Sequence, residues 1–254
     1  MARSQLQEPR FLCETCGYEL AHDAADGEVC PECGRPVADS LGRVRVGSPW
    51  QQRPSVESYV ASWVGVLTSP GQLLSVLSPG STRHLLLAHT LVASGVAFLC
   101  ALVALGPDVL RGRVTVWSIW FDGFGGLRGS ALIGIAIITS VVSLLIPLLS
   151  VIEAIGLRII AWQRRWRFGK GYSSAIVAHG AAGWVTGVML GGPLLATAAL
   201  AYDSLDWIGI SYRASHKFAI AGAVAMVAGL LLFEMFAWRG LRRCRFANSP
   251  PDVR

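Results

Sequence analysis

The sequence predicts an all-α membrane protein, in which a four-helix transmembrane bundle follows an amphipathic helix and a small N-terminal β ribbon. Hydrophobic residues make up 53% of the 254 residues and charged residues only 15%, whereas soluble domains carry about 25% charge. The apolar residues gather in blocks of about 20, the length that crosses a bilayer core. The N-terminal part instead holds two matched pairs of cysteines. The sequence therefore predicts a polar segment that contains cysteines, followed by a longer segment embedded in lipid.

The first domain, residues 1–46, is polar and acidic. It holds eight acidic and five basic residues, a net charge of −3, so residues 47–254 carry the rest of the +6, a net of +9. Binding to nucleic acid requires Lys and Arg on phosphates, and we expect no nucleic-acid partner for this domain. The opening MARSQLQEPR has no apolar h-region, so we expect no cleaved signal peptide.

Four cysteines of this domain form a repeated Cys-x-x-Cys-Gly pattern: Cys13, Cys16, Cys30 and Cys33. Two such pairs allow four thiolates to converge on one tetrahedral zinc ion. Gly17 and Gly34 each follow the second cysteine of a pair and supply a residue that tolerates positive φ in the turn. The pattern predicts one structural Zn²⁺, since four protein ligands leave no open position for water.

Two disulfides are the alternative use of these cysteines, but they require an oxidising compartment. The distribution of basic residues, described below, predicts that this end faces the reducing cytosol. We interpret the remaining cysteines more simply, Cys100 as a small apolar residue of the first span and Cys244 as an incidental thiol of the tail.

Residues 47–80 connect the ribbon to the bundle. Residues 47–54, GSPWQQRP, contain breakers and predict a flexible linker. Residues 55–80 predict amphipathic interfacial helices, because Ser55 can cap a helix with a single apolar stripe. The stripe comprises Val56, Tyr59, Val60, Trp63, Val64 and Leu67. A second short apolar piece follows Pro70 and lacks Lys and Arg, which favours docking on the bundle over binding to anionic lipid.

The transmembrane domain, residues 83–240, contains four apolar blocks long enough to span a bilayer. They cover about residues 85–105, 131–152, 174–202 and 218–238. Pro147 predicts a kink in the second, and Gly191-Gly192-Pro193 predicts a break in the third. Gly183 and Gly187 begin a four-residue spacing of small residues that favours close helix packing.

Basic residues in the connecting segments predict the orientation. The segment between spans two and three and the tail, residues 241–254 with the preceding Arg239, are rich in bases: Arg158, Arg164, Arg165, Arg167, Lys170, Arg239, Arg242, Arg243, Arg245 and Arg254. The alternating segments have fewer: Arg111, Arg113, Arg128, Arg213 and Lys217. The pattern predicts a multi-pass protein of the cell (inner) membrane with both termini in the cytosol.

One ionisable residue lies in each span, or directly after it, near the predicted cytosolic end: His89, Glu153, His179 and Glu234. If the helices present them inward, these side chains form a polar layer that could bind a metal or pass protons. The simpler interpretation is that Glu153 lies among headgroups and that the others make single interhelical hydrogen bonds.

The cysteine pattern resembles the rubredoxin-type zinc ribbons that precede membrane domains in bacterial proteins. Residues 63–70, WVGVLTSP, followed by a short apolar helix and a multi-span bundle, resemble the Yip family of membrane proteins over about residues 56–238. That resemblance implies a non-catalytic role in membrane organisation or trafficking, although the family has five spans where four are predicted here.

These observations favour a non-enzymatic membrane protein whose ribbon contacts a cytosolic protein. No phosphate-binding loop, nucleophile elbow or His-Glu-x-x-His helix occurs in the sequence. The alternative is a small transporter or channel that uses the polar layer.

Overall fold

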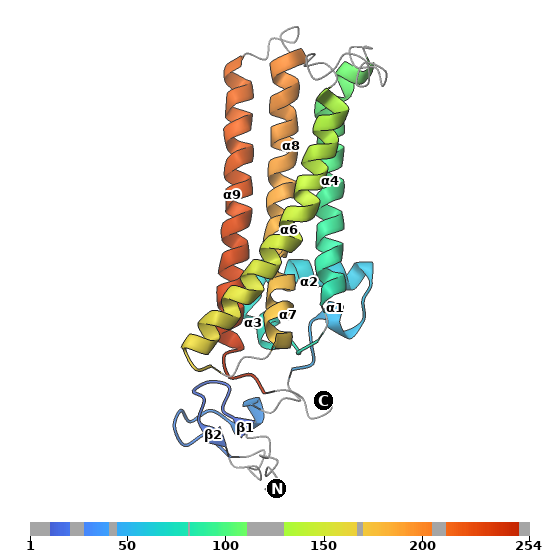
Figure 1. The fold of residues 1–254 in the computed structure, drawn as a ribbon. Coiled ribbons are helices and arrows are strands. Elements are labelled where there is room, and N and C mark those ends of the chain that lie inside the picture. The colour runs from blue at the N-terminus through green and yellow to red at the C-terminus, as the bar shows by residue number, and fades with distance from the viewer. Residues whose placement is uncertain are drawn as a thin grey trace, which may run out of the picture. The chain divides into compact units, whose positions relative to one another are not determined.

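The computed structural model describes residues 11–20, 28–40, 45–80, 82–110, 130–166, 170–204 and 212–248. Within them the chain is mostly helical, with one small antiparallel sheet near the N-terminus (Figure 1). The elements are β1 (Phe11–Leu12), β2 (Glu19–Leu20), a 3-10 helix (Val37–Ser40), α1 (Pro49–Gln52), α2 (Val56–Thr68), α3 (Pro70–Ser75), α4 (Arg83–Leu110), α6 (Ser130–Gln163), α7 (Lys170–Gly180), α8 (Ala182–Ser204) and α9 (Tyr212–Arg243).

Among the described residues, four helical stretches are long and apolar enough to cross a membrane: Arg83–Ala104, Ile137–Gln163, Gly171–Leu200 and Ser215–Arg243. The predicted fold class, an all-α bundle with a small β ribbon, is therefore confirmed. Apolar side chains cover the outside of these helices, as the exposed Leu91, Leu144 and Val224 illustrate. Such surfaces are expected where lipid, not water, is the solvent.

The chain forms two compact units. Unit 1 consists of Met1–Arg83, Ile152–His179 and Phe236–Arg254, and unit 2 of His84–Val151 and Gly180–Met235. Helices α6 and α9 contribute residues to each.

The third apolar segment is divided at Ala181, between α7 and α8. The predicted break at Gly191-Gly192-Pro193 is wrong, because Pro193 lies inside α8. Pro147 lies inside α6, where the predicted kink stays a prediction. A helix in lipid has no water to satisfy freed backbone groups, which favours keeping the helical backbone around a proline.

Glycines line the contact between α8 and α9 in unit 2. A Cβ atom on Gly183 would lie 2.5 Å from the backbone nitrogen of Phe233, and one on Gly191 2.7 Å from the carbonyl oxygen of Gly222. Gly187 faces Gly229 so closely that a Cβ on Gly229 would lie 2.6 Å from the Cα of Gly187. The predicted close packing of small residues is confirmed.

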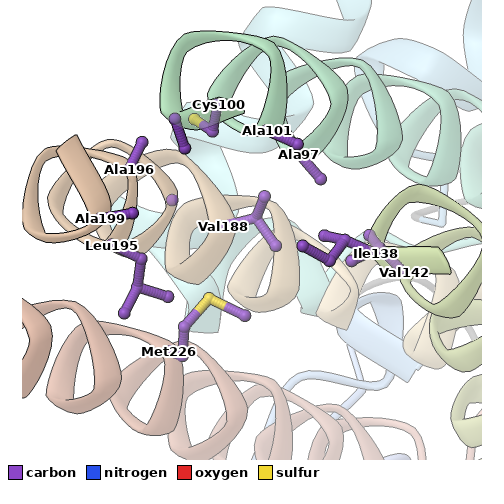
Figure 2. A pocket seen from close by; sticks show the side chains of 12 residues that line it. Ala97, Cys100, Ala101, Ile138, Val142, Val188, Leu195, Ala196, Ala199 and Met226 are labelled. Atoms are coloured by element: carbon purple, nitrogen blue, oxygen red, sulfur yellow. The ribbon is translucent and has the colours of Figure 1, made fainter. Parts of the chain in front are cut away.

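A cavity of about 260 Å³ lies among α4, α6, α8 and α9 in unit 2 (Figure 2). Its described lining is apolar, with Cys100 and Met226 contributing sulfur and Val188 projecting toward the middle in this view. No charged side chain is among the described lining residues. These lining residues therefore offer no counter-charge to an ion.

Residues 47–54, predicted to be a flexible linker, contain helix α1 with a complete capping box from Ser48 and Gln51. Ser48 is fully buried, and the Gln51 amide donates to the Ser78 carbonyl oxygen at 2.9 Å. This segment is thus a packed part of unit 1.

Helix α2 turns part of its predicted apolar stripe outward. Val56, Val60 and Val64 are exposed, while Ser58 and Ser62 are buried. The small serines allow close packing, and Ser62 Oγ accepts a hydrogen bond from the Trp50 backbone at 3.0 Å. The exposed valines leave an apolar helix face of the kind that binds at a membrane interface.

Candidate metal centre and its docking network

Each Cys-x-x-Cys pair closes a turn of the same form, which we call the first knuckle (residues 13–18) and the second knuckle (residues 30–35). In the first, the Gly17 amide donates to the Cys13 carbonyl oxygen, and in the second the Gly34 amide donates to that of Cys30, both at 2.8 Å. Gly17 has a φ of 84° and Gly34 one of 68°. The predicted requirement for positive φ is confirmed, and a side chain at either position would be strained.

The knuckles bring the four predicted ligands together. All four sulfur atoms lie within 4.8 Å of one another, and Cys13–Cys33 and Cys16–Cys30 are each separated by 3.6 Å between sulfurs. All four cysteines are free. A tetrahedral ion with metal–sulfur bonds of about 2.3 Å would separate its sulfurs by about 3.8 Å, so the four residues fit one metal ion.

The pKa values of the cysteine thiols are shifted in different directions. Burial raises the pKa of Cys13, but backbone hydrogen bonds from Cys16 and Thr15 and a thiol hydrogen bond from Cys33 outweigh it and lower that pKa to about 6. Burial, together with its hydrogen bond to Cys13, raises the pKa of Cys16 to about 12. A backbone hydrogen bond from Arg35 lowers the pKa of Cys33, yet burial and the neighbouring thiols leave it raised. The Cys13 thiolate therefore forms readily at neutral pH, while Cys16 and Cys33 keep their protons.

The ribbon has almost no core apart from these cysteines. Its buried cluster consists of Cys13, Leu20, Cys30 and Val37, with Phe11 packed beside it. Such a small apolar cluster cannot offset the entropy of folding. Metal ligation is therefore the main source of stability within the ribbon itself.

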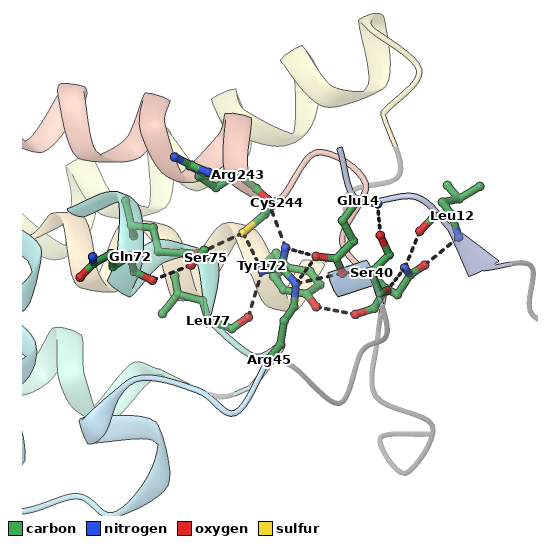
Figure 3. Close-up of polar contacts among 12 residues, drawn as sticks. Leu12, Glu14, Ser40, Arg45, Gln72, Ser75, Leu77, Tyr172, Arg243 and Cys244 are labelled. Atoms are coloured by element: carbon green, nitrogen blue, oxygen red, sulfur yellow. Dashed lines mark hydrogen bonds and ion pairs between the residues drawn. The ribbon is translucent and has the colours of Figure 1, made fainter. Parts of the chain in front are cut away.

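Glu14, inside the first knuckle, pairs with a buried arginine (Figure 3). Arg45 Nε lies 3.1 and 3.0 Å from the two carboxylate oxygens of Glu14, and its Nη2 lies 2.8 Å from Oε2. Arg45 is 4% exposed. Burial lowers the pKa of Arg45, but the hydrogen bond and negative charge of Glu14 help to raise it above its ordinary value, so the guanidinium is a cation. This two-pronged geometry is the strong form of an arginine–carboxylate pair.

The Arg45 guanidinium also contacts the helical part of unit 1. It donates to the carbonyl oxygen of Arg243 at 3.1 Å and to that of Leu77 at 3.4 Å. The Tyr172 ring lies 5.3 Å from the guanidinium carbon. Arg45 therefore connects the first knuckle with the ends of α3 and α9 and with α7.

Asn248 completes the connection between the ribbon and the tail. Its side chain accepts from the Leu12 amide at 3.1 Å and donates to the carbonyl oxygens of Leu12 and Ser40 at 2.7 and 2.6 Å. Its backbone amide donates to Glu14 at 2.8 Å, and its carbonyl oxygen accepts from the Tyr172 hydroxyl at 2.9 Å. These bonds and the Arg45 contacts form what we call the latch.

The two knuckles differ in what they contact. A Cβ on Gly17 would lie 2.8 Å from the Phe246 ring, and the Thr15 carbonyl oxygen accepts from Arg245. Around Gly34, by contrast, no atom of the described residues lies within 4 Å of the same position. The first knuckle is docked on the tail, and the second is exposed.

Cys244, interpreted from sequence as an incidental thiol, is fully buried beneath the latch. Its sulfur accepts from Arg45 at 3.5 Å and donates to the Leu74 carbonyl oxygen at 3.7 Å. Burial raises its pKa to about 11 despite the nearby guanidinium, so the thiol is protonated at neutral pH. That interpretation is wrong, because the side chain is a packed part of unit 1.

Sequence reasoning missed Glu14, Arg45 and Asn248. Glu14 sits inside a recognisable motif, but its partners are 31 and 234 residues away. Contacts between residues so far apart in the chain leave no periodic pattern in the sequence. No local signal distinguishes Glu14 from Glu32, which lies between the cysteines of the second pair and is exposed.

The four residues of the predicted polar layer fall in different units. Glu153 and His179 belong to unit 1, and His89 and Glu234 to unit 2. His89 and His179 are buried, Glu153 is half-buried and Glu234 is exposed. His179 uses both ring nitrogens: Nδ1 lies 2.7 Å from the Ala175 carbonyl oxygen and Nε2 2.8 Å from Ser48 Oγ.

Compared with family models, curated proteins and solved structures, the chain matches none. The four-cysteine centre and the apolar helices are the features of the chain that bear on its function.

Proposed function

We propose that this chain is a multi-pass membrane protein whose N-terminal ribbon binds one structural zinc ion and serves as a cytosolic protein-interaction module. The observation that carries the proposal is the convergence of four thiols within 4.8 Å on a ribbon attached to four potential membrane spans. The resemblance to the Yip family favours membrane organisation or trafficking as the process.

Zinc is the metal that this ligand set favours. Four thiolates in tetrahedral arrangement suit zinc or iron–sulfur chemistry, and the repeated Cys-x-x-Cys-Gly knuckles are typical of structural zinc. Because all four positions are filled by protein, the ion would stabilise the ribbon and would not activate water.

The latch supports a topology with both ends on one side of the membrane. Leu12 and Asn248 are hydrogen-bonded to each other, and four spans return the chain to its starting side. Arg158, Arg164 and Arg243 belong to the same unit as the ribbon. The preference of basic residues for the cytosolic side then favours the cytosol for that unit.

The second knuckle is the part of the ribbon best suited to a partner. Pro31, Glu32 and Arg35 are exposed there, and the adjacent Val29 is 59% exposed. An exposed valine beside acidic Glu28 and Glu32 suits a protein surface that presents apolar and basic side chains.

Two measurements on the purified full-length protein test the proposal. Elemental analysis should find one zinc per chain in the parent protein and none in Cys33→Ser. The Val29→Asp variant should keep its zinc but no longer capture the cytosolic protein that the parent captures. The control variant Val56→Asp, at an exposed site on α2, should still capture that protein. Full zinc in Cys33→Ser, or capture that is unaffected by Val29→Asp, would contradict the proposed ribbon function.

A further inference from the structure

We infer that the metal state of the four-cysteine centre controls the latch, so that loss of the metal releases the first knuckle from the tail and uncovers Cys244. The inference rests on the proposed metal site. It goes beyond it by making the ribbon a metal-dependent switch within unit 1.

Glu14 links the metal-binding knuckle to the latch through its position in the chain. Its backbone lies between the ligands Cys13 and Cys16, and its amide donates to Ser40 Oγ at 3.1 Å. The knuckle that holds the metal therefore also fixes the carboxylate that accepts from Arg45. A ribbon whose core is half cysteine loses this knuckle when the metal leaves.

Arg45 loses its counter-ion when Glu14 moves away. Arg45 is buried and faces two carbonyl oxygens, a protonated thiol and an aromatic ring. Those groups do not neutralise a cation, and a buried charge without its counter-ion is strongly unfavourable. The segment that carries Arg45 must then move toward water. Asn248 loses its partners Leu12 and Ser40 in the same event.

Cys244 is uncovered when Arg45 moves. Arg45 and Leu74 contact its sulfur directly, and it has no exposed surface while the latch is closed. Movement of Arg45 removes one side of that enclosure. Cys244 is therefore a built-in probe of the latch.

The test compares alkylation of Cys244 by N-ethylmaleimide in zinc-loaded and chelator-treated full-length protein, with each cysteine followed separately by peptide mass spectrometry. We expect the rate at Cys244 to rise at least tenfold on metal removal, while Cys100 in α4, outside unit 1, keeps its rate. An unchanged Cys244 rate in protein that has lost its zinc overturns the switch but leaves the metal site standing. Absence of zinc in the purified parent instead overturns the proposed metal site.

The Glu14→Gln variant opens the latch without touching a metal ligand. We expect rapid alkylation of Cys244 even with zinc bound, because a neutral amide cannot balance Arg45. The matched control is Glu32→Gln, an exposed acid inside the second knuckle, which should keep Cys244 protected. Protection of Cys244 in Glu14→Gln equal to that in the parent overturns the inference.

Coupling between two sites is reciprocal. If zinc closes the latch, the closed latch must tighten zinc binding by the same factor. Competition with a chromophoric chelator should therefore show weaker zinc binding in Glu14→Gln than in Glu32→Gln. Equal zinc affinities in the two variants would contradict the coupling.

Discussion

At the scale of single residues, the ribbon depends on side chains that do more than one task. Cys13 is a potential metal ligand and also part of the small ribbon core. Glu14, the next residue, is the carboxylate that pairs with Arg45. The ligands could be predicted from sequence because a metal site repeats a local spacing. The Glu14–Arg45 pair could not, because neither residue type nor spacing identifies the partner of a surface-like acid.

The fork geometry at Arg45 predicts that lysine cannot replace it. Arg45→Lys keeps the charge but loses the paired bonds to Glu14 and the bond to the Arg243 carbonyl oxygen. We expect a loss of about 1–3 kcal/mol in the free energy of unfolding, measured as a lower melting temperature in detergent. Arg35→Lys, at an exposed site of the ribbon, is the control and should leave the melting temperature unchanged.

Zinc affinity should fall as the pH is lowered. Cys16 and Cys33 have raised pKa values in the metal-free ribbon, so they hold protons at neutral pH that zinc must displace. Each displaced proton should weaken binding about tenfold per unit decrease in pH. Below about pH 6, where Cys13 also takes up a proton, the dependence should become steeper. Chelator competition from pH 8 to pH 5 measures this, and a pH-independent affinity would contradict ligation by these thiols.

At the scale of elements, apolar length and small-residue spacing predict helices and one helix contact. The four apolar blocks correspond to the four helical stretches, and Gly183, Gly187 and Gly191 form the contact with α9 that their spacing indicates. The division at Ala181 was not predicted. Glycine and proline mark positions where a helix can be interrupted, but packing decides which of them is used, as the continuous helix through Pro193 illustrates.

The glycine contact between α8 and α9 predicts a position-specific effect of a larger side chain. Gly187→Leu places atoms where a Cβ alone would lie 3.0 Å from the Cα of Gly229. The helices must separate, and we expect a loss of about 1–3 kcal/mol. Gly95→Leu in α4, where no atom lies within 4 Å of the added Cβ, is the matched control. Melting temperatures that fall equally in both variants would show that loss of helical glycine, not the contact, is responsible.

At the scale of the whole molecule, sequence predicts an N-terminal ribbon and a separate bundle joined by a linker. The structure instead includes the ribbon, α1–α3, α7 and the end of α9 in unit 1. Composition identifies a polar segment and an apolar one, but it does not reveal that Asn248 and Leu12 are neighbours across 236 residues. Breaker residues such as those of residues 47–54 are as compatible with a short capped helix as with a flexible chain.

The topology predicted for the whole molecule can be tested with added cysteines in intact cells. Asp252→Cys should resist a membrane-impermeant maleimide until the cells are permeabilised, because the tail is expected in the cytosol. Thr115→Cys, between the first two spans, should be labelled from outside. Labelling of Asp252→Cys in intact cells would contradict the proposed orientation.

The contact between Leu12 and Asn248 also has a consequence for biosynthesis. The first knuckle leaves the ribosome long before Asn248 is made, since 236 residues separate the hydrogen-bonded pair. All the apolar helices must therefore be synthesised before the ribbon can reach its docking position. The ribbon can dock only after that point, so a closed latch marks a chain that has been translated at least as far as Asn248.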